Sequence, residues 1–311
     1  MKHRVTRSRR ICRKQIRQNT EKLKKKKYFY FNPWLIVSLL LVLGGTLYLL
    51  KPKLKYAFTH TSAKLMNFYE ASKNLSMGEK IAFWSEKLIL DPKLLVPFGA
   101  GPKLPDSLPL FSKKYDCTTY VETVAALAKS KSTMELADQI IRIRYYRGNV
   151  SYETRNHFPE ADWIPNNKAN RVLSDVTENL AYQVGLTPSF AKKEIHKKDW
   201  LEQNKGAYRF LAQSSPDVVS VRVPYIPLQE MPHVLKHVSQ GSLVNIVREN
   251  KSSKPVLITH QGFLIWKGGK AYFRHADKEN QVLETPWEEY VDFLKSRPWK
   301  VLGFNINTFN G

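Results

Sequence analysis

The fold of this chain is decided around residues 115–122, which read YDCTTYVE. Apolar residues recur at helical spacing after the cysteine, at Val121, Val124 and Ala128. This spacing predicts a helix that begins near Cys117. A thiol at a helix start faces unpaired backbone N–H groups and the positive end of the helix dipole, which favour the thiolate and can hold an oxyanion. We therefore interpret Cys117 as a candidate nucleophile.

The composition is that of a globular protein with an unusually basic start. The chain has 311 residues, 42% of them hydrophobic, which is enough to build one domain of moderate size with a buried core. Of the formal charge of +23, residues 1–27 carry +12, from 13 lysines and arginines and one glutamate, which leaves +11 for residues 28–311. That remainder suits anionic partners in general, and we expect no nucleic-acid partner.

Residues 28–50 contain no charged side chain over 23 positions, which is long enough to span a bilayer. Aromatic residues and lysines flank the segment, as they do at membrane interfaces. We predict a single transmembrane anchor; a buried core helix and a cleaved signal peptide are the alternatives. Ten lysines and arginines in residues 8–27 against four in residues 51–70 predict an N-terminus in the cytoplasm and a catalytic domain on the periplasmic or outer side of the cytoplasmic membrane.

The chain therefore divides into four predicted parts. They are a basic cytoplasmic tail over 1–27, the transmembrane anchor over 28–50, a juxtamembrane linker over 51–74 and a single domain over 75–311. The tail is interpreted as a lipid-facing charge cluster.

The only other cysteine, Cys12, lies in the tail. Because the predicted membrane span separates it from Cys117, an intramolecular disulfide is excluded. The alternative for Cys117 is a small buried side chain, since free cysteine is among the most buried residue types. Composition alone favours burial, whereas the position at a helix start favours chemistry.

Periodicity within the domain predicts helices over residues 72–90 and 134–145 and a strand over 243–247. Residues 148–170 show neither period. We expect a long irregular loop there, a kind of segment that is often functional.

A β-hairpin is the second informative feature. Two β-rich runs, residues 256–266 and 271–275, are separated by the sequence KGGK. This pattern predicts a hairpin with Gly268 and Gly269 at its tip. Because side chains alternate between faces, a shift of one residue in the turn would change which side chains meet.

With that turn, His275 lies opposite Gly262 and Asp277 lies opposite His260. The two histidines then share one face as diagonal neighbours, about 7–8 Å apart between backbones. A nucleophilic thiol needs a base, and the base needs a third group that fixes its tautomer and orientation. His260 and His275 are predicted to fill these roles, with Asp277 as the alternative orienting group.

Metal binding is the competing use of cysteine and histidine. The sequence contains no Cys-x-x-Cys or His-Glu-x-x-His spacing. It also lacks the glycine-rich loops that bind phosphates or dinucleotides. We therefore predict neither a metal nor a cofactor.

Several short motifs together resemble N-acetylmuramoyl-L-alanine amidase-like domains of the NlpC-type, papain-like cysteine peptidases. They are DCTTYVE at 116–122, RNHF at 155–158, DWI at 162–164, YIP at 225–227, THQGF at 259–263 and RHA at 274–276. The resemblance covers roughly residues 75–311. It implies an α+β, papain-like NlpC-type fold in which a catalytic helix packs on an antiparallel sheet, here preceded by the predicted transmembrane helix.

By this resemblance, the family's nucleophile corresponds to Cys117, its base to His260 and its third polar residue to His275. The implied reaction is hydrolysis of the amide between N-acetylmuramic acid and L-alanine in peptidoglycan fragments. A γ-D-glutamyl peptide bond, an acyl transfer on a lipid, and a non-catalytic wall-binding module are the alternatives. The sequence VPFG at residues 96–99 only loosely matches the family's Gly-x-Pro-Tyr turn, which bears on substrate specificity.

The resemblance also implies a substrate cleft in the stretch that follows the second predicted helix. Arginine there suits a carboxylate, and tryptophan suits a sugar or peptide face. The alternative is that these side chains only brace a long loop. The candidate substrate-binding residues are Arg155, His157, Asp162 and Trp163.

Overall fold

The computed structural model describes residues 63–91, 94, 115–150, 154–156, 158–196, 218–279 and 281–311. All of them belong to one compact unit, Tyr56–Gly311. The predicted tail and anchor, the VPFG stretch and His157 lie outside the described residues. The predicted four-part division of the chain therefore stays a prediction.

Helices dominate the first half of the described chain. They are α3 (Met77–Leu90), α4 (Cys117–Lys129), α5 (Leu136–Arg144), the 3-10 turn η2 (Tyr146–Gly148), the π-helical η3 (Pro159–Trp163), α6 (Ile164–Ala169) and α7 (Thr177–Gln183). Three shorter segments follow later, namely α10 (Met231–Val234), η4 (Leu235–His237) and α11 (Trp287–Lys295).

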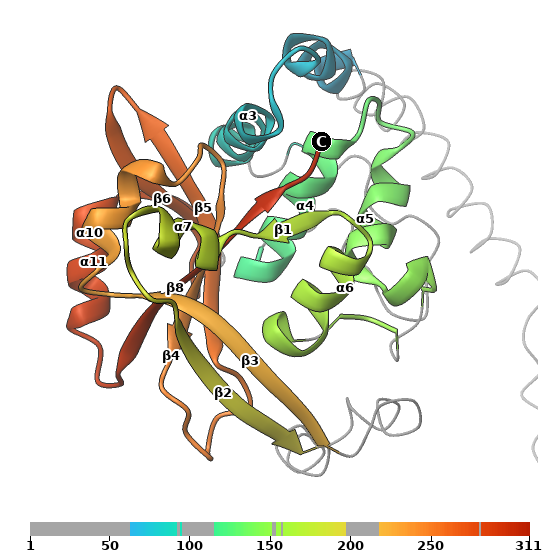
Figure 1. Cartoon of the computed structure of the whole chain (residues 1–311). Helices are drawn as coiled ribbons and strands as arrows, with labels where there is room; N and C mark the ends of the chain where they lie inside the picture. Colours follow the sequence, from blue (N-terminus) through green and yellow to red (C-terminus); the bar gives the residue numbers. More distant parts are fainter. Residues whose placement is uncertain are drawn as a thin grey trace, which may run out of the picture. The chain divides into compact units, whose positions relative to one another are not determined.

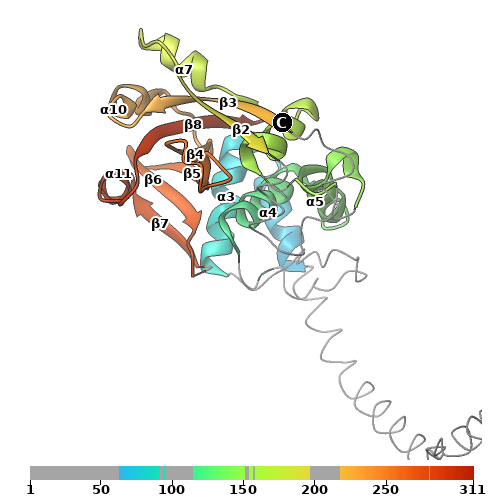
Figure 2. The ribbon, with the colours of Figure 1, turned by 90° about the horizontal axis from the view of Figure 1, so that it is seen from below.

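The strands form one antiparallel sheet. They are β1 (Leu173–Asp175), β2 (Ser189–His196), β3 (Val218–Pro227), β4 (Leu243–Arg248), β5 (Ile258–Lys267), β6 (Lys270–Ala276), β7 (Val282–Pro286) and β8 (Val301–Phe309). Their order is β2-β3-β8-β4-β5-β6-β7, and β1 also pairs with β8. The C-terminal strand therefore lies inside the sheet, between β3 and β4 (Figures 1 and 2).

Helices cover both faces of the sheet (Figure 1). One apolar cluster joins α3, α4 and α5 to one face, and a second joins α10 and α11 to the other. Neighbouring residues of β5 show the alternation, because Phe263 belongs to the first cluster and Leu264 to the second. Successive side chains of a strand point to opposite faces, so β5 takes part in both cores.

The β5–β6 hairpin has the predicted register. Phe263 pairs with Arg274, and Lys267 pairs with Lys270 at the tip. Gly268 and Gly269 have φ angles of 54° and 76°, a left-handed conformation that glycine adopts without steric cost.

Other predicted elements are confirmed with shifted ends. The strand predicted over 243–247 is β4, and the helix predicted over 134–145 is α5. The helix predicted over 72–90 begins later, as α3, because Ser76 caps its first turn in a capping box with Glu79. The irregular loop predicted over 148–170 is wrong in its second half, where η3 and α6 form.

The predicted fold class needs a correction. An α+β fold with the helix of Cys117 packed against an antiparallel sheet is present. No helix among the described residues is long and apolar enough to cross a membrane. The residues that the structure describes therefore form an α+β fold with an eight-stranded antiparallel sheet and without a transmembrane helix. Membership of the NlpC-type, papain-like group stays a prediction.

Candidate active site

The start of α4 is fixed by side chains on both sides of Cys117. Asp116 is the N-cap residue, and its Oδ1 accepts a hydrogen bond from the Thr119 backbone N–H at 2.7 Å. The Thr119 hydroxyl in turn accepts the Asp116 N–H at 3.0 Å. This capping box makes Cys117 the first residue of the helix, so the thiol lies where the sequence predicts it.

Cys117 is half-buried, and its sulfur lies 4.0 Å from the Thr118 hydroxyl. Burial and the nearby charge of Asp116 raise the pKa of the thiol, although hydrogen bonds from Thr118 and from the Gln261 backbone favour the ionised form. The predicted preference for a thiolate is therefore outweighed by desolvation. The resting thiol is protonated at neutral pH.

The two predicted histidines are hydrogen-bonded to each other. His260 of β5 and His275 of β6 approach with 2.9 Å between His260 Nε2 and His275 Nδ1. Their rings stand nearly perpendicular, with centroids 4.8 Å apart. Because Nε2 of His260 is engaged, Nδ1 is its remaining ring nitrogen for a partner such as the thiol.

Aromatic rings enclose this pair. Phe273 stacks on His275 with centroids 4.9 Å apart, and Tyr290 lies 5.2 Å from the same ring. Burial lowers the pKa of His260 to about 3 and that of His275 to about 4. Both imidazoles are therefore neutral at pH 7 and able to accept a proton.

Gly262 allows the pair to be packed in this way. A Cβ atom built there would lie 2.5 Å from the Phe273 ring and 2.7 Å from the Arg274 carbonyl oxygen. The place that a side chain at position 262 would take is thus filled by the Phe273 ring.

The thiol lies close to the strand that carries His260. A hydrogen bond from the backbone N–H of Gln261, the residue that follows His260 in β5, lowers the pKa of the thiol against the effect of burial. The Thr118 hydroxyl donates to Gln261 Oε1 at 3.0 Å, which joins the first turn of α4 to β5. Burial raises the pKa of Tyr290, and an ionised Cys117 would raise it further. Tyr290 packs on His275. The joint action of Cys117, His260 and His275 stays a prediction.

A cavity of about 560 Å³ opens beside the histidines. Its walls include His260, His275 and the apolar side chains Leu283 and Phe293. Cationic side chains also line it, at Lys278 and Arg297. Such a mixture of apolar walls and a few charged groups is typical of ligand sites.

Asp277 lines the same cavity but is held by its own turn. Its Oδ1 accepts the backbone N–H groups of Glu279 at 2.8 Å and Gln281 at 2.9 Å. Its charge favours the protonated forms of His260 and His275 without outweighing burial. The geometry thus favours His275 over Asp277 as the orienting group.

The predicted substrate-binding stretch lies against α4 and α5. Trp163 is fully buried and donates from Nε1 to Glu122 of α4 at 3.0 Å, so it presents no face to a sugar. Asp162 accepts the Phe158 N–H at 2.8 Å. Half-buried Arg155 pairs with Tyr145 through the backbone and favours ionisation of Glu122. The contacts described for these three residues are with the loop itself and with the core. Substrate contact by Arg155 or Asp162 stays a prediction.

Sequence reasoning missed a buried row of amides behind the thiol. Gln261 Nε2 donates to Asn245 Oδ1 at 2.8 Å, and Asn245 Nδ2 donates to Asn305 Oδ1 at 2.9 Å. These three side chains are at most 1% exposed. The available signal was polar residues at inward positions of three strands that otherwise carry apolar ones.

No group of three or more His, Cys, Asp or Glu side chains in the described part of the chain is placed to hold a metal ion. The chemistry that this arrangement offers is that of a thiol, a neutral imidazole base and a second imidazole that orients the first.

Comparison with known proteins points to one family. A family model described as N-acetylmuramoyl-L-alanine amidase-like matches residues 97–297. No curated protein matches the chain.

Two similar solved structures share the fold. A Legionella pneumophila protein has 24% identity and a TM-score of 0.68, covering 81% of this chain and 95% of its own. An N-acetylmuramoyl-L-alanine amidase from Bacteroides uniformis has 24% identity and a TM-score of 0.51, covering 63% of this chain and 84% of its own.

Proposed function

The chain belongs to the N-acetylmuramoyl-L-alanine amidase-like family, and on that premise we propose that it is a cysteine amidase. Its proposed substrate is the amide between the lactyl group of N-acetylmuramic acid and L-alanine in peptidoglycan fragments. The family and the amidase from Bacteroides uniformis support a hydrolase that acts on cell-wall amides. The more specific part of the proposal is that Cys117 is the nucleophile of this reaction.

One observation carries this more specific part. The 2.9 Å contact between His260 Nε2 and His275 Nδ1 leaves Nδ1 of His260 for the thiol. A hydrogen bond from the backbone N–H of Gln261, the residue after His260, favours the ionised form of the thiol. Cysteine and serine hydrolases use the same series of groups, in which a base activates the nucleophile and a third group orients the base.

The first half of the reaction forms a thioester. As the Cys117 sulfur attacks the lactyl carbonyl carbon, its proton passes to Nδ1 of His260. The carbonyl oxygen becomes an oxyanion, which the free backbone N–H of Cys117 at the helix start can stabilise. The C–N bond then breaks, and His260 gives the proton to the leaving amine of L-alanine.

The second half regenerates the thiol. Water attacks the thioester carbonyl and gives a proton to His260, the C–S bond breaks, and that proton returns to the sulfur. The products are the free lactyl carboxyl group of the sugar and the intact peptide. While His260 is protonated, its Nε2–H donates to His275 Nδ1, which keeps the ring oriented.

The resting charge state fits a coupled proton transfer. Because burial keeps the thiol protonated and both histidines neutral, no thiolate–imidazolium pair stands ready before substrate binds. Proton transfer to His260 and attack on the carbonyl therefore occur together. Single-turnover hydrolysis is therefore expected to be slower in D2O than in H2O, because a proton is transferred in the same step as the attack.

Defined muropeptides test the bond that is cut. The full chain is incubated with an N-acetylmuramoyl-tripeptide beside its Cys117→Ala variant, and the products are identified by mass spectrometry. Sugar and intact peptide as separate products are expected from the wild-type chain alone. A shortened peptide would indicate a γ-D-glutamyl endopeptidase. Binding without any product would indicate a wall-binding module.

A further inference from the structure

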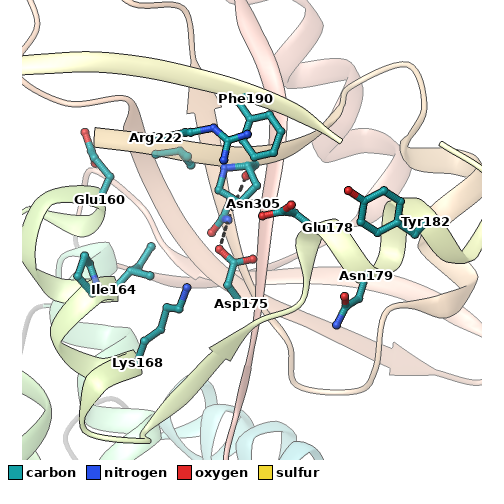
Figure 3. A pocket seen from close by; sticks show the side chains of 13 residues that line it. Glu160, Ile164, Lys168, Asp175, Glu178, Asn179, Tyr182, Phe190, Arg222 and Asn305 are labelled. Carbon is teal, nitrogen blue, oxygen red and sulfur yellow. Dashed lines mark hydrogen bonds between the residues drawn. The ribbon is translucent and has the colours of Figure 1, made fainter. Parts of the chain in front are cut away.

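A second cavity, of about 600 Å³, lies on the other side of the buried amide row. It is bounded by α6 and α7 and by the ribbon of β2 and β3, and Asn305 of β8 lies at its floor (Figure 3). Among the described residues, its lining has no member in common with the cavity beside His260. Its volume is within the range of small-ligand sites.

Side chains of both charges line this cavity, among them the Glu160 carboxylate. Asp175 and Glu178 come from β1 and α7, whereas Lys168 comes from α6 and Arg222 from β3. Figure 3 shows Lys168 and Asp175 extending into the same space. Among the described residues, none of Glu178, Lys168 and Arg222 has a salt-bridge partner.

One of the two cationic side chains, Arg222, is oriented by an aromatic ring. The Arg222 guanidinium carbon lies 3.3 Å from the centre of the Phe190 ring of β2. A guanidinium stacked on an aromatic face keeps the N–H groups at its edge available, and that edge matches a carboxylate in geometry. Arg222 is therefore held in an orientation suited to binding a carboxylate.

One of the carboxylates, that of Asp175, is also held in place by hydrogen bonds. Asp175 accepts the Asn305 side-chain amide at 2.8 Å through Oδ2 and the Thr177 backbone N–H at 3.0 Å through Oδ1. Asn305 itself is 1% exposed. Each carboxylate oxygen can accept a further hydrogen bond, so Asp175 and its neighbour Glu178 can receive an ammonium group together.

We propose that this cavity is a second binding site, for a small zwitterionic ligand that carries both an ammonium and a carboxylate group. Arg222 and Lys168 take the carboxylate, and Glu178 and Asp175 take the ammonium. A ligand that carries only one of these charges leaves either the two cationic side chains or the two carboxylates without a partner, which weakens its binding. Free amino acids and short peptides have the required chemistry.

The proposed function suggests a probe, and the choice of probe rests on that function. Cleavage of the muramoyl amide turns the alanine nitrogen into an ammonium group, while the peptide already carries carboxylates. The dipeptide L-alanyl-γ-D-glutamate is such a product: it is a zwitterion with a single ammonium group, which its N-acetylated form lacks. The pair isolates the contribution of the ammonium.

Calorimetric titration of the full-length Cys117→Ala chain tests the site. The dipeptide is expected to bind with one-to-one stoichiometry, and both N-acetylation and the substitutions Glu178→Gln and Arg222→Gln are expected to weaken binding about tenfold or more. Glu288→Gln and Lys270→Gln, at exposed positions outside both cavities, serve as matched controls that leave binding unchanged.

Free L-alanine is titrated in parallel. Binding of L-alanine that the same two substitutions weaken supports a site for the amino-acid end; binding of the dipeptide alone supports a site for the whole peptide. Absence of binding for both probes at millimolar concentration, or binding that ignores the substitutions, overturns the proposal. Since the Cys117→Ala chain is used, this outcome is independent of whether the wild-type chain hydrolyses muropeptides.

Discussion

At the scale of single residues, the chemistry depends on groups that are kept neutral. The first turn of α4 favours an ionised thiol, but burial of Cys117 has the larger effect on its pKa. The same is true of His260 and His275, where desolvation outweighs the charge of Asp277. A neutral thiol and a neutral base are compatible with catalysis if the proton moves during attack.

The buried histidines predict a specific loss of stability in acid. Free histidine has a pKa of about 6.5, whereas the folded-state values are about 3 for His260 and about 4 for His275. Between these limits the unfolded chain binds more protons than the folded chain, so stability falls as pH falls from about 6.5 towards 4. Each histidine contributes at most about 1.4 kcal/mol per pH unit.

Urea unfolding at several pH values between 7 and 4.5 measures this slope. The His260→Asn and His275→Asn variants are expected to lose stability less steeply than the wild-type chain. His233→Asn, at an exposed position, is the control and should keep the wild-type slope. Equal slopes in all four proteins would contradict the assignment of buried neutral histidines.

Several site residues could be predicted from the sequence, because short-range rules apply to them. The turn glycines determine the register that brings His260 and His275 together, and apolar periodicity places Cys117 at a helix start. The burial of Trp163 could not be predicted, because it results from a hydrogen bond to Glu122 on a distant element. The desolvation of Cys117 is likewise a tertiary effect.

At the scale of secondary structure, the cap of α4 has two roles. The reciprocal bonds of Asp116 and Thr119 stabilise the helix and also fix the position of Cys117. Asp116→Ala is expected to lower the free energy of unfolding by about 1 kcal/mol and to reduce kcat, because the thiol is no longer held beside His260. Urea unfolding and initial rates measure the two effects.

Ser76→Ala provides the matched control for this substitution. Ser76 caps α3 with the same capping-box geometry, but its helix carries none of the predicted catalytic residues. Its removal should cost similar stability and leave kcat close to the wild-type value. Equal losses of kcat in the two variants would show that the cap of α4 acts only through stability.

The segment from Pro159 to Ala169 shows where prediction from local sequence ends. Its two prolines and polar residues give no apolar period, yet it forms η3 and α6. Contacts with distant elements hold it: Asn167 Nδ2 donates to the Ile143 carbonyl at 3.0 Å, and the Glu160 carboxylate accepts the backbone N–H groups of Leu257 and Ile258. Tertiary contacts of this kind override weak local propensity.

At the scale of the whole domain, Arg274 connects the helical layer to the sheet. It is 1% exposed and donates to the Ala82 carbonyl at 2.8 Å and to Ser85 Oγ at 2.6 Å, both in α3. It also forms an ion pair with Glu284 of β7. Because Arg274 directly precedes His275, this network also supports the hairpin that carries the base.

Loss of this arginine should destabilise the domain strongly. Arg274→Met removes a buried charge and leaves the Ala82 carbonyl and the Ser85 hydroxyl without their donor, with an expected cost of roughly 3 kcal/mol in urea unfolding. Lys267→Met removes a half-exposed lysine that also pairs with Glu284, and should cost less than about 1 kcal/mol. Similar costs for both variants would mean that Arg274 is no more important than a surface ion pair.

The dependence of hydrolysis on Cys117 tests the central claim most directly. The initial rate of L-alanine amine release from an N-acetylmuramoyl-tripeptide is measured for the wild-type chain and for Cys117→Ala, with circular dichroism confirming that both are folded. The account predicts release by the wild-type chain and a rate at the uncatalysed background for the variant. Release by Cys117→Ala at a rate comparable to the wild type would contradict it.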